Sequence, residues 1–179
     1  MIDPATLWRL GGWLLYLGIA LALIGVRLMP MSGGTLGFPG PDVLTALTLA
    51  WVLRRPDQVP MALIAIAFLA EDVLLMRPPG LWAAIVVTAS AFLRHREHAW
   101  RDMPFAAEWA LVGLVLAAMM LAERTVMAIT FNAQPALGQH LLQLLATLLV
   151  YPLIVLAARA ILGMRRAAPG EVDRLGHRR

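Results

Sequence analysis

From Thr125 to Ala158 the chain carries no formally charged side chain, and this feature constrains the fold more than any other. A segment this long without a charged side chain does not fit a water-soluble domain, whose surface carries charged groups. The whole sequence has the same character, since 60% of its 179 residues are hydrophobic, 15% are charged and the mean hydropathy is +0.74. Ordinary globular chains are about half apolar and about a quarter charged. The sequence therefore predicts an integral membrane protein.

Six apolar segments are candidates for transmembrane helices. A bilayer core of about 30 Å requires roughly 20 mostly apolar residues per helix. The expected spans are residues 7–29, 41–53, 59–76, 80–93, 105–122 and 141–164, of which the second and fourth are short. We expect these spans to form one compact all-α bundle over residues 1–164, followed by a basic tail over residues 165–179.

The basic residues predict the orientation. The chain contains no lysine, so all 15 basic side chains are arginines, and arginine accumulates in cytoplasmic loops. With both termini in the cytoplasm, only Arg27, Arg77 and Arg124 lie outside. The predicted cytoplasmic loops carry Arg54, Arg55, Arg94, Arg96 and Arg101. These basic loops can bind anionic lipid or a cytoplasmic protein partner. The chain has no sizeable polar region for binding nucleic acid.

Residues typical of catalysis or metal binding are scarce. The absence of cysteine excludes a disulfide framework, a thiolate metal site and a cysteine nucleophile. His95 and His98 have a spacing compatible with metal, but no further ligands accompany them, which favours a solvated loop. The sequence lacks nucleophile, zinc-protease and phosphate-loop motifs. We therefore predict no enzymatic activity, no catalytic residue, no cofactor and no metal.

Glu71 and Asp72 are the most conspicuous charges inside a span. Helical neighbours point about 100° apart, so we do not expect the two carboxylates to share one site. A proton or cation site is one interpretation. A buried ion-pair cluster that fixes the packing of the first, third and fifth spans is the favoured one, with Arg27 and Arg124 at similar depth. Arg77 reaches Asp72 only if the helix ends before the two prolines that follow.

Two further acidic residues have expected structural roles. Asp42 follows Gly40-Pro41, a pattern typical of a helix start, so we expect it to cap the second span. Glu108 lies about one turn into the fifth span and Arg159 about one turn from the end of the sixth. Antiparallel neighbours bring these positions to equal depth, which predicts an interhelical ion pair.

Small residues recur along the first span. Gly11, Gly18 and Gly25 repeat every seven positions, and Ala22 follows Gly18 by four. Such a stripe lets another helix backbone approach closely. Packing inside the bundle is the favoured interpretation, and a docking groove for a helix of another protein is the alternative.

The middle of the chain carries a family resemblance. The segments PDVLTALTLAWVLRRP (residues 41–56), FLAEDVLL (68–75) and RPPGLWAA (77–84) resemble the MreD family of rod shape-determining proteins, and more narrowly its alphaproteobacterial form. The clear match covers residues 41–96. The matching positions are Pro41, Asp42, Trp51, Pro56, Asp72 and Gly80.

This resemblance implies a non-enzymatic scaffold in the bacterial inner membrane, within the cell-elongation machinery. It implies MreC as the direct partner, with RodA, a penicillin-binding transpeptidase and MreB in the same complex. It also implies a fold similar to the substrate-binding subunits of energy-coupling-factor transporters. The alternative function is a substrate-binding membrane subunit of a vitamin-type transporter, which requires a cavity lined by facing polar or aromatic groups.

Overall fold

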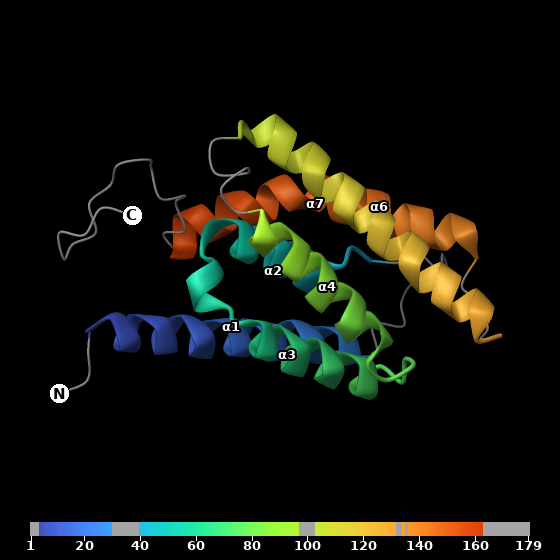
Figure 1. The fold of residues 1–179 in the computed structure, drawn as a ribbon, viewed down its shortest axis with the longest axis horizontal. Helices are drawn as coiled ribbons and strands as arrows, with labels where there is room; N and C mark the ends of the chain where they lie inside the picture. Colours follow the sequence, from blue (N-terminus) through green and yellow to red (C-terminus); the bar gives the residue numbers. More distant parts are fainter. Residues whose placement is uncertain (1–3, 30–39, 97–102, 132–133, 135, 163–179) are drawn as a thin grey trace.

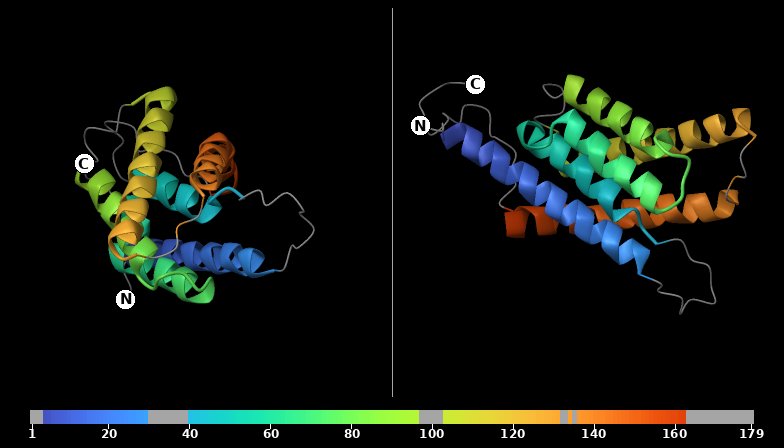
Figure 2. Two further views of the ribbon diagram at one scale, coloured as in Figure 1. Left: turned by 90° about the vertical axis from the view of Figure 1, so that its right-hand side faces the viewer. Right: turned by 90° about the horizontal axis from the view of Figure 1, so that it is seen from below.

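The computed structural model describes residues 4–29, 40–96, 103–131, 134 and 136–162. Successive α-helices in these ranges run in alternating directions and form an elongated bundle (Figures 1 and 2). The helices are α1 (Pro4–Leu28), α2 (Val43–Arg54), α3 (Met61–Leu74), α4 (Leu81–His95), α6 (Phe105–Ile129) and α7 (Leu137–Leu162), with the 3-10 helix η1 (Pro56–Gln58) between α2 and α3. The all-α prediction is confirmed, and a helix occupies each predicted position.

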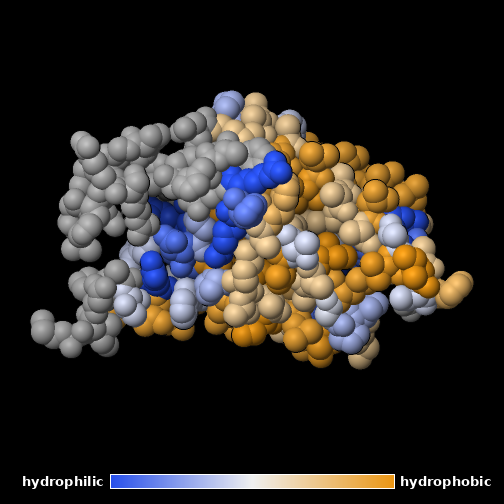
Figure 3. Space-filling view, viewed as in Figure 1, coloured by the Kyte–Doolittle hydropathy of each residue, from blue (hydrophilic) through white to orange (hydrophobic). Residues whose placement is uncertain are grey.

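The alternating directions divide the arginines between the two ends of the bundle. We call the end where α1, α3 and α6 begin the basic end, and the opposite end the far end. Figure 3 shows hydrophilic side chains gathered mainly at the basic end and apolar side chains over most of the remaining face. Described arginines at the basic end are Arg9, Arg54, Arg55, Arg94, Arg96 and Arg159, and those at the far end are Arg27, Arg77 and Arg124.

Three helices are long and apolar enough to cross a membrane, over Thr6–Leu28, Phe105–Ile129 and Leu137–Ala160. Helices α2, α3 and α4 contain 12, 14 and 15 residues. At 1.5 Å per residue they measure about 18 to 23 Å, which is less than the roughly 30 Å of a bilayer core. The predicted helices are therefore present, but only three of the six predicted spans have full crossing length.

Proline and glycine set the ends of the short helices. Helix α2 ends at Arg54 because Arg55 precedes a proline and adopts φ −142°, ψ 64°. The turn from α3 to α4 contains two residues with positive φ, Met76 at 51° and Gly80 at 86°. Glycine adopts this conformation without steric cost. The turn reverses the chain, and α3 and α4 pack side by side.

Helix α2 is enclosed by the rest of the bundle. Its residues from Leu44 to Val52 are all buried, and it packs against α7, α4 and α1. Trp51 is fully buried and meets the ring of Tyr16 edge-on, with centroids 5.6 Å apart. Because neighbouring helices cover α2 on all sides, its length does not have to match the thickness of a bilayer.

Gly12 lets the chain after α2 approach α1. A Cβ atom added at Gly12 would lie 2.8–3.0 Å from the side chain of Gln58 in η1. The Gln58 amide oxygen accepts a hydrogen bond of 3.2 Å from the indole nitrogen of Trp51. Gly12 therefore permits the contact that holds η1 between α1 and α2. Sequence reasoning singled out its neighbour Gly11 instead.

Helix α7 contains Pro152, and a side chain of α6 replaces the hydrogen bond that this proline removes. Proline has no N–H, so within a helix the carbonyl four residues earlier, that of Leu148, loses its usual donor. The indole Nε1 of Trp109 in α6 donates to this carbonyl at 2.9 Å. A membrane interior offers no water as a substitute. The hydrogen bond therefore fixes the register of α6 against α7.

We expect Trp109→Phe to lower the stability of the bundle by about 1–3 kcal/mol, because the Leu148 carbonyl is left without this donor. The measurement is the midpoint of thermal unfolding of the protein purified in a mild detergent. In a Pro152→Ala background the new backbone N–H restores the ordinary helical bond, so the same substitution should have little effect. Equal losses in both backgrounds would contradict this role.

Candidate functional site

The first buried charge cluster lies at the far end and joins three helices. Arg27, at the end of α1, pairs with Asp42 at 2.9 Å and also with Glu71 in α3. Asp42 is the N-cap of α2 and accepts hydrogen bonds from the Thr45 backbone N–H and hydroxyl. The expected cap is therefore in place. The cluster joins α1 and α3 as predicted, but its third member is α2 rather than the fifth span, α6.

Asp72 has a separate structural task from Glu71. One of its carboxylate oxygens accepts the backbone N–H groups of Gly80 and Ala83, each at 3.1 Å. An acceptor at this position satisfies N–H groups that the start of a helix leaves open. Asp72 thus stabilises the beginning of α4 from α3. The two adjacent carboxylates serve different sites, as their 100° separation predicts.

A second charge cluster is buried at the basic end. Arg54 of α2 contacts Glu108 of α6 at 2.7 Å, and both side chains are almost fully buried. The hydroxyl of Tyr151 in α7 donates to the same Glu108 oxygen at 2.5 Å. The cluster joins three helices in the core. It also satisfies a carboxylate that would otherwise be costly to bury.

This second cluster corrects two predictions. Arg54 is not a loop residue, because it lies at the last position of α2 with its side chain inside the bundle. It takes the place beside Glu108 that was predicted for Arg159, which is exposed. The reason is helical phase: Val155 and Ala158 face the core, so Arg159, about 100° further round, faces outward.

The other predicted basic residues lie nearer the surface. Arg55 lies over the ring of Trp8, 5.2 Å from its centroid, and Arg96 lies over that of Phe92 at 5.5 Å. Arg94 donates to the carbonyl of Val59, which links α4 to the start of α3. Arg101 lies outside the described residues, as does His98. Within the described ranges, no group of three potential metal-ligating side chains occurs.

The glycine stripe of α1 faces away from the bundle. Tyr16, Ala20 and Ile24 form the buried face of α1, whereas Gly11 and Gly18 are exposed. Cβ atoms added at Gly11, Gly18 or Gly25 would meet nothing within 4 Å in the described structure. Ala22 is exposed beside them. The favoured interpretation, packing inside the bundle, is therefore wrong, and the outward-facing alternative fits the geometry.

Leucines complete this outward face. They alternate with the glycines at intervals of four and three residues, which is the spacing of a heptad seam. The leucines are exposed, with Leu14 at 71% and Leu21 at 61%. We call this set the α1 seam: Leu7, Gly11, Leu14, Gly18, Leu21, Gly25 and Leu28. At about 100° per residue it lies roughly opposite the buried face of α1.

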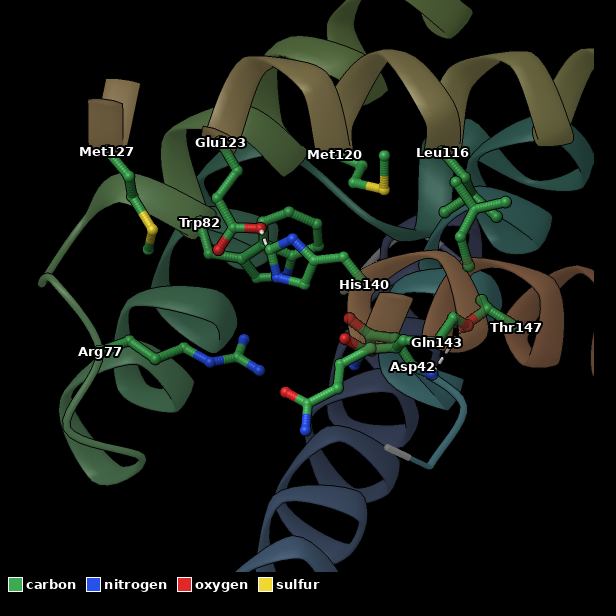
Figure 4. Close-up of a pocket in the computed structure, with 12 residues that line it drawn as sticks. Asp42, Arg77, Trp82, Leu116, Met120, Glu123, Met127, His140, Gln143 and Thr147 are labelled. Atoms are coloured by element: carbon green, nitrogen blue, oxygen red, sulfur yellow. Dashed lines mark hydrogen bonds and ion pairs between the residues drawn. The ribbon is translucent and has the colours of Figure 1, made fainter. Parts of the chain in front are cut away.

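A cavity of about 390 Å³ lies at the far end, among α4, α6 and α7. Figure 4 shows Arg77 pointing into it from the turn after α3 and Glu123 entering from α6. Asp42 and Thr147 form its floor, where the Asp42 backbone N–H donates to the Thr147 hydroxyl at 2.8 Å. This volume is within the range of small-molecule sites.

Comparisons with known protein families, curated proteins and solved structures find no match to this chain. The resemblance to MreD and the expected likeness to a transporter subunit fold therefore stay predictions.

Sequence reasoning missed Tyr151, Thr147 and Trp109, the polar side chains that connect α7 with α2 and α6. One signal was available for Trp109, since Pro152 leaves a carbonyl that requires a donor. Tyr151 and Thr147 carried no comparable signal, because either residue is common on a helix surface.

We expect Arg54→Met to destabilise the protein by roughly 3–5 kcal/mol, because Glu108 then loses its buried cationic partner. Replacing both groups, as Arg54→Met with Glu108→Leu, should be less damaging than either single change. Thermal unfolding in detergent measures all three variants. Arg159→Met is the matched control and should stay within about 0.5 kcal/mol of the unchanged protein. Additive losses in the double variant would contradict the pairing.

Proposed function

We propose that this protein is a non-enzymatic scaffold of the bacterial cell-elongation machinery in the cytoplasmic membrane, and that its α1 seam binds the single transmembrane helix of MreC. RodA, the penicillin-binding transpeptidase and MreB join the same complex. The scaffold acts through its membrane-facing helices, and its basic end faces the cytoplasm. Two independent lines support this proposal: the MreD-like segments over residues 41–96 and the outward orientation of the α1 seam.

The α1 seam is the observation that carries the proposal. Helix association in a lipid environment depends on close van der Waals packing, and small residues permit the closest approach of two backbones. Here the small residues are uncovered in the described structure, with larger apolar side chains on alternate steps. The leucines of the seam project from α1, and each glycine between them leaves a gap into which a side chain of a partner helix fits.

The spacing also favours one geometry of the complex. A repeat of seven residues over two turns keeps contact with a partner when the two helices cross with a left-handed twist of about 20°. The seam covers α1 from Leu7 to Leu28, a length that matches one membrane crossing. We therefore expect the MreC helix to follow α1 along its whole length.

The transporter-subunit alternative rests on a different observation. The cavity at the far end has polar and aromatic lining groups from several helices, which is what a substrate-binding subunit requires. Such a subunit would be recovered with energy-supplying ATPase subunits instead of MreC.

Cysteine cross-linking tests the docking site, because the chain has no cysteine of its own. Single substitutions at Leu14 or Gly18 should cross-link in native membranes to MreC carrying one cysteine in its span. Leu15→Cys is the matched control, since Leu15 is exposed on α1 but lies outside the seam. Equal cross-linking from Leu15, or cross-links only between copies of this chain, would count against the proposal.

A bulky substitution tests the same site by a second measurement. Gly18→Leu adds bulk to the seam at a position where an added Cβ atom meets none of the other described helices within 4 Å, so the isolated protein should keep its unfolding midpoint. Co-purification with MreC should fall, roughly tenfold if close packing contributes about 1.4 kcal/mol. Leu15→Trp adds comparable bulk beside the seam and should leave the recovery unchanged. Undiminished recovery with Gly18→Leu would place the MreC contact on another helix.

A further inference from the structure

The far-end cavity contains a guanidinium group that makes no direct ion pair or hydrogen bond with the described residues. Arg77 enters the cavity from the turn between α3 and α4, and its guanidinium makes no ion pair or hydrogen bond among the described residues. Arg27, which lies close to the floor of the cavity, is instead paired with the two carboxylates of Asp42 and Glu71. The carboxylates of Glu71, Asp72 and Glu123 attract Arg77 only from beyond ion-pair distance, so its N–H donors stay available to a ligand. A charged side chain inside a membrane protein is by default a candidate functional group.

Trp82 adds a second open donor. Its side chain lines the cavity from the first turn of α4, and its indole Nε1 is buried without a hydrogen-bond partner. Buried polar groups are nearly always satisfied in folded proteins, so an exception indicates a missing acceptor. Arg77 and Trp82 together form a wall with several N–H donors. An acidic group, phosphate or carboxylate, is the chemistry that satisfies them.

Glu123 adds an acidic group to a polar lining that also includes Gln139, His140 and Gln143 of α7. Glu123 enters from α6, and the Nε2 atom of the His140 ring lies 3.9 Å from its carboxylate. This distance is too long for a hydrogen bond, so the carboxylate can still accept one from a ligand. Figure 4 shows Glu123 and Arg77 on different sides of the same space. A ligand between them must offer an acceptor to Arg77 and a donor to Glu123.

The apolar part of the lining comes from α6 and α7. Leu116, Met120, Met127 and Leu144 contribute this surface. Methionine adapts its shape to irregular apolar groups. Gln139, which is exposed, lies at the rim and places one opening at the surface of the far end. The cavity thus combines a polar recess with an apolar wall.

We propose that this cavity binds a zwitterionic head group, in which a phosphate or carboxylate is joined by a short link to an ammonium group. Arg77 and Trp82 hold the acidic group, Glu123 accepts from the ammonium, and the apolar wall contacts the carbon chain beyond it. The head group can belong to a membrane lipid or to a free small molecule. The proposal rests on the cavity alone and does not depend on docking at the α1 seam.

The test uses the full-length protein, stripped of lipid in detergent and examined by native mass spectrometry with added lipids. Phosphatidylethanolamine should bind more tightly than phosphatidylcholine, which has no N–H, and than phosphatidylglycerol, which has no cation. Water-soluble glycerophosphoethanolamine distinguishes the sources. Full competition by it supports a free ligand, and failure to compete supports a lipid. Equal retention of all three lipids would indicate unspecific association and overturn the proposal.

Variants assign the individual groups. Arg77→Gln should weaken phosphatidylethanolamine binding roughly tenfold or more, since charge-assisted hydrogen bonds are lost. Trp82→Phe keeps the ring, removes one donor and should weaken binding less. Glu123→Gln should keep the lipid bound but abolish the preference for ethanolamine over choline. Arg159→Gln, at the basic end, is the matched control and should change nothing. Unaltered binding in Arg77→Gln, with the unfolding midpoint preserved, would overturn the proposal.

Discussion

The enclosure of α2 is the constraint on which the rest of the structure depends. A helix of 12 residues that is buried on all sides has backbone N–H groups at its start and C=O groups at its end without partners inside the helix. Each end is therefore met by a charge cluster, with Arg27, Asp42 and Glu71 at one and Arg54, Glu108 and Tyr151 at the other. These clusters reach α1, α3, α6 and α7. The bundle is thus organised around the shortest α-helix that the structure describes.

This arrangement separates charges that hold the fold from groups that remain available. Most of the acidic residues that look functional in the sequence are used internally, as caps or as ion pairs between helices. The groups left over are of two kinds. Along α1 they are apolar and form a continuous outward face. In the far-end cavity they are the Arg77 guanidinium and the Trp82 indole N–H, which make no hydrogen bond among the described residues. The α1 seam lies outside the two clusters, and the cavity meets the first cluster at Asp42.

The sequence predicted the helices well, because long apolar runs interrupted by proline and glycine leave few alternatives. It predicted the cap at Asp42 for the same reason, since the surrounding pattern is local. The side-chain partners that join different helices were harder to predict from the sequence. Equal depth made Arg159 a reasonable partner for Glu108, but depth does not specify which way a side chain points around the helix axis. The seven-residue spacing showed that the glycines share one face of α1 and could not show which face meets the bundle. The cavity was not predictable, because its lining comes from four separate stretches of the chain.

The enclosure of α2 also imposes an order on biogenesis. The helix is synthesised early, yet the residues that satisfy its ends and sides, Glu108, Thr147 and Tyr151, come from α6 and α7. Before those helices emerge, α2 is too short to cross a bilayer and has Asp42 and Arg54 at its ends. It is therefore expected to wait at the membrane surface while the longer helices insert. The centre of this bundle is one of the last parts to be assembled.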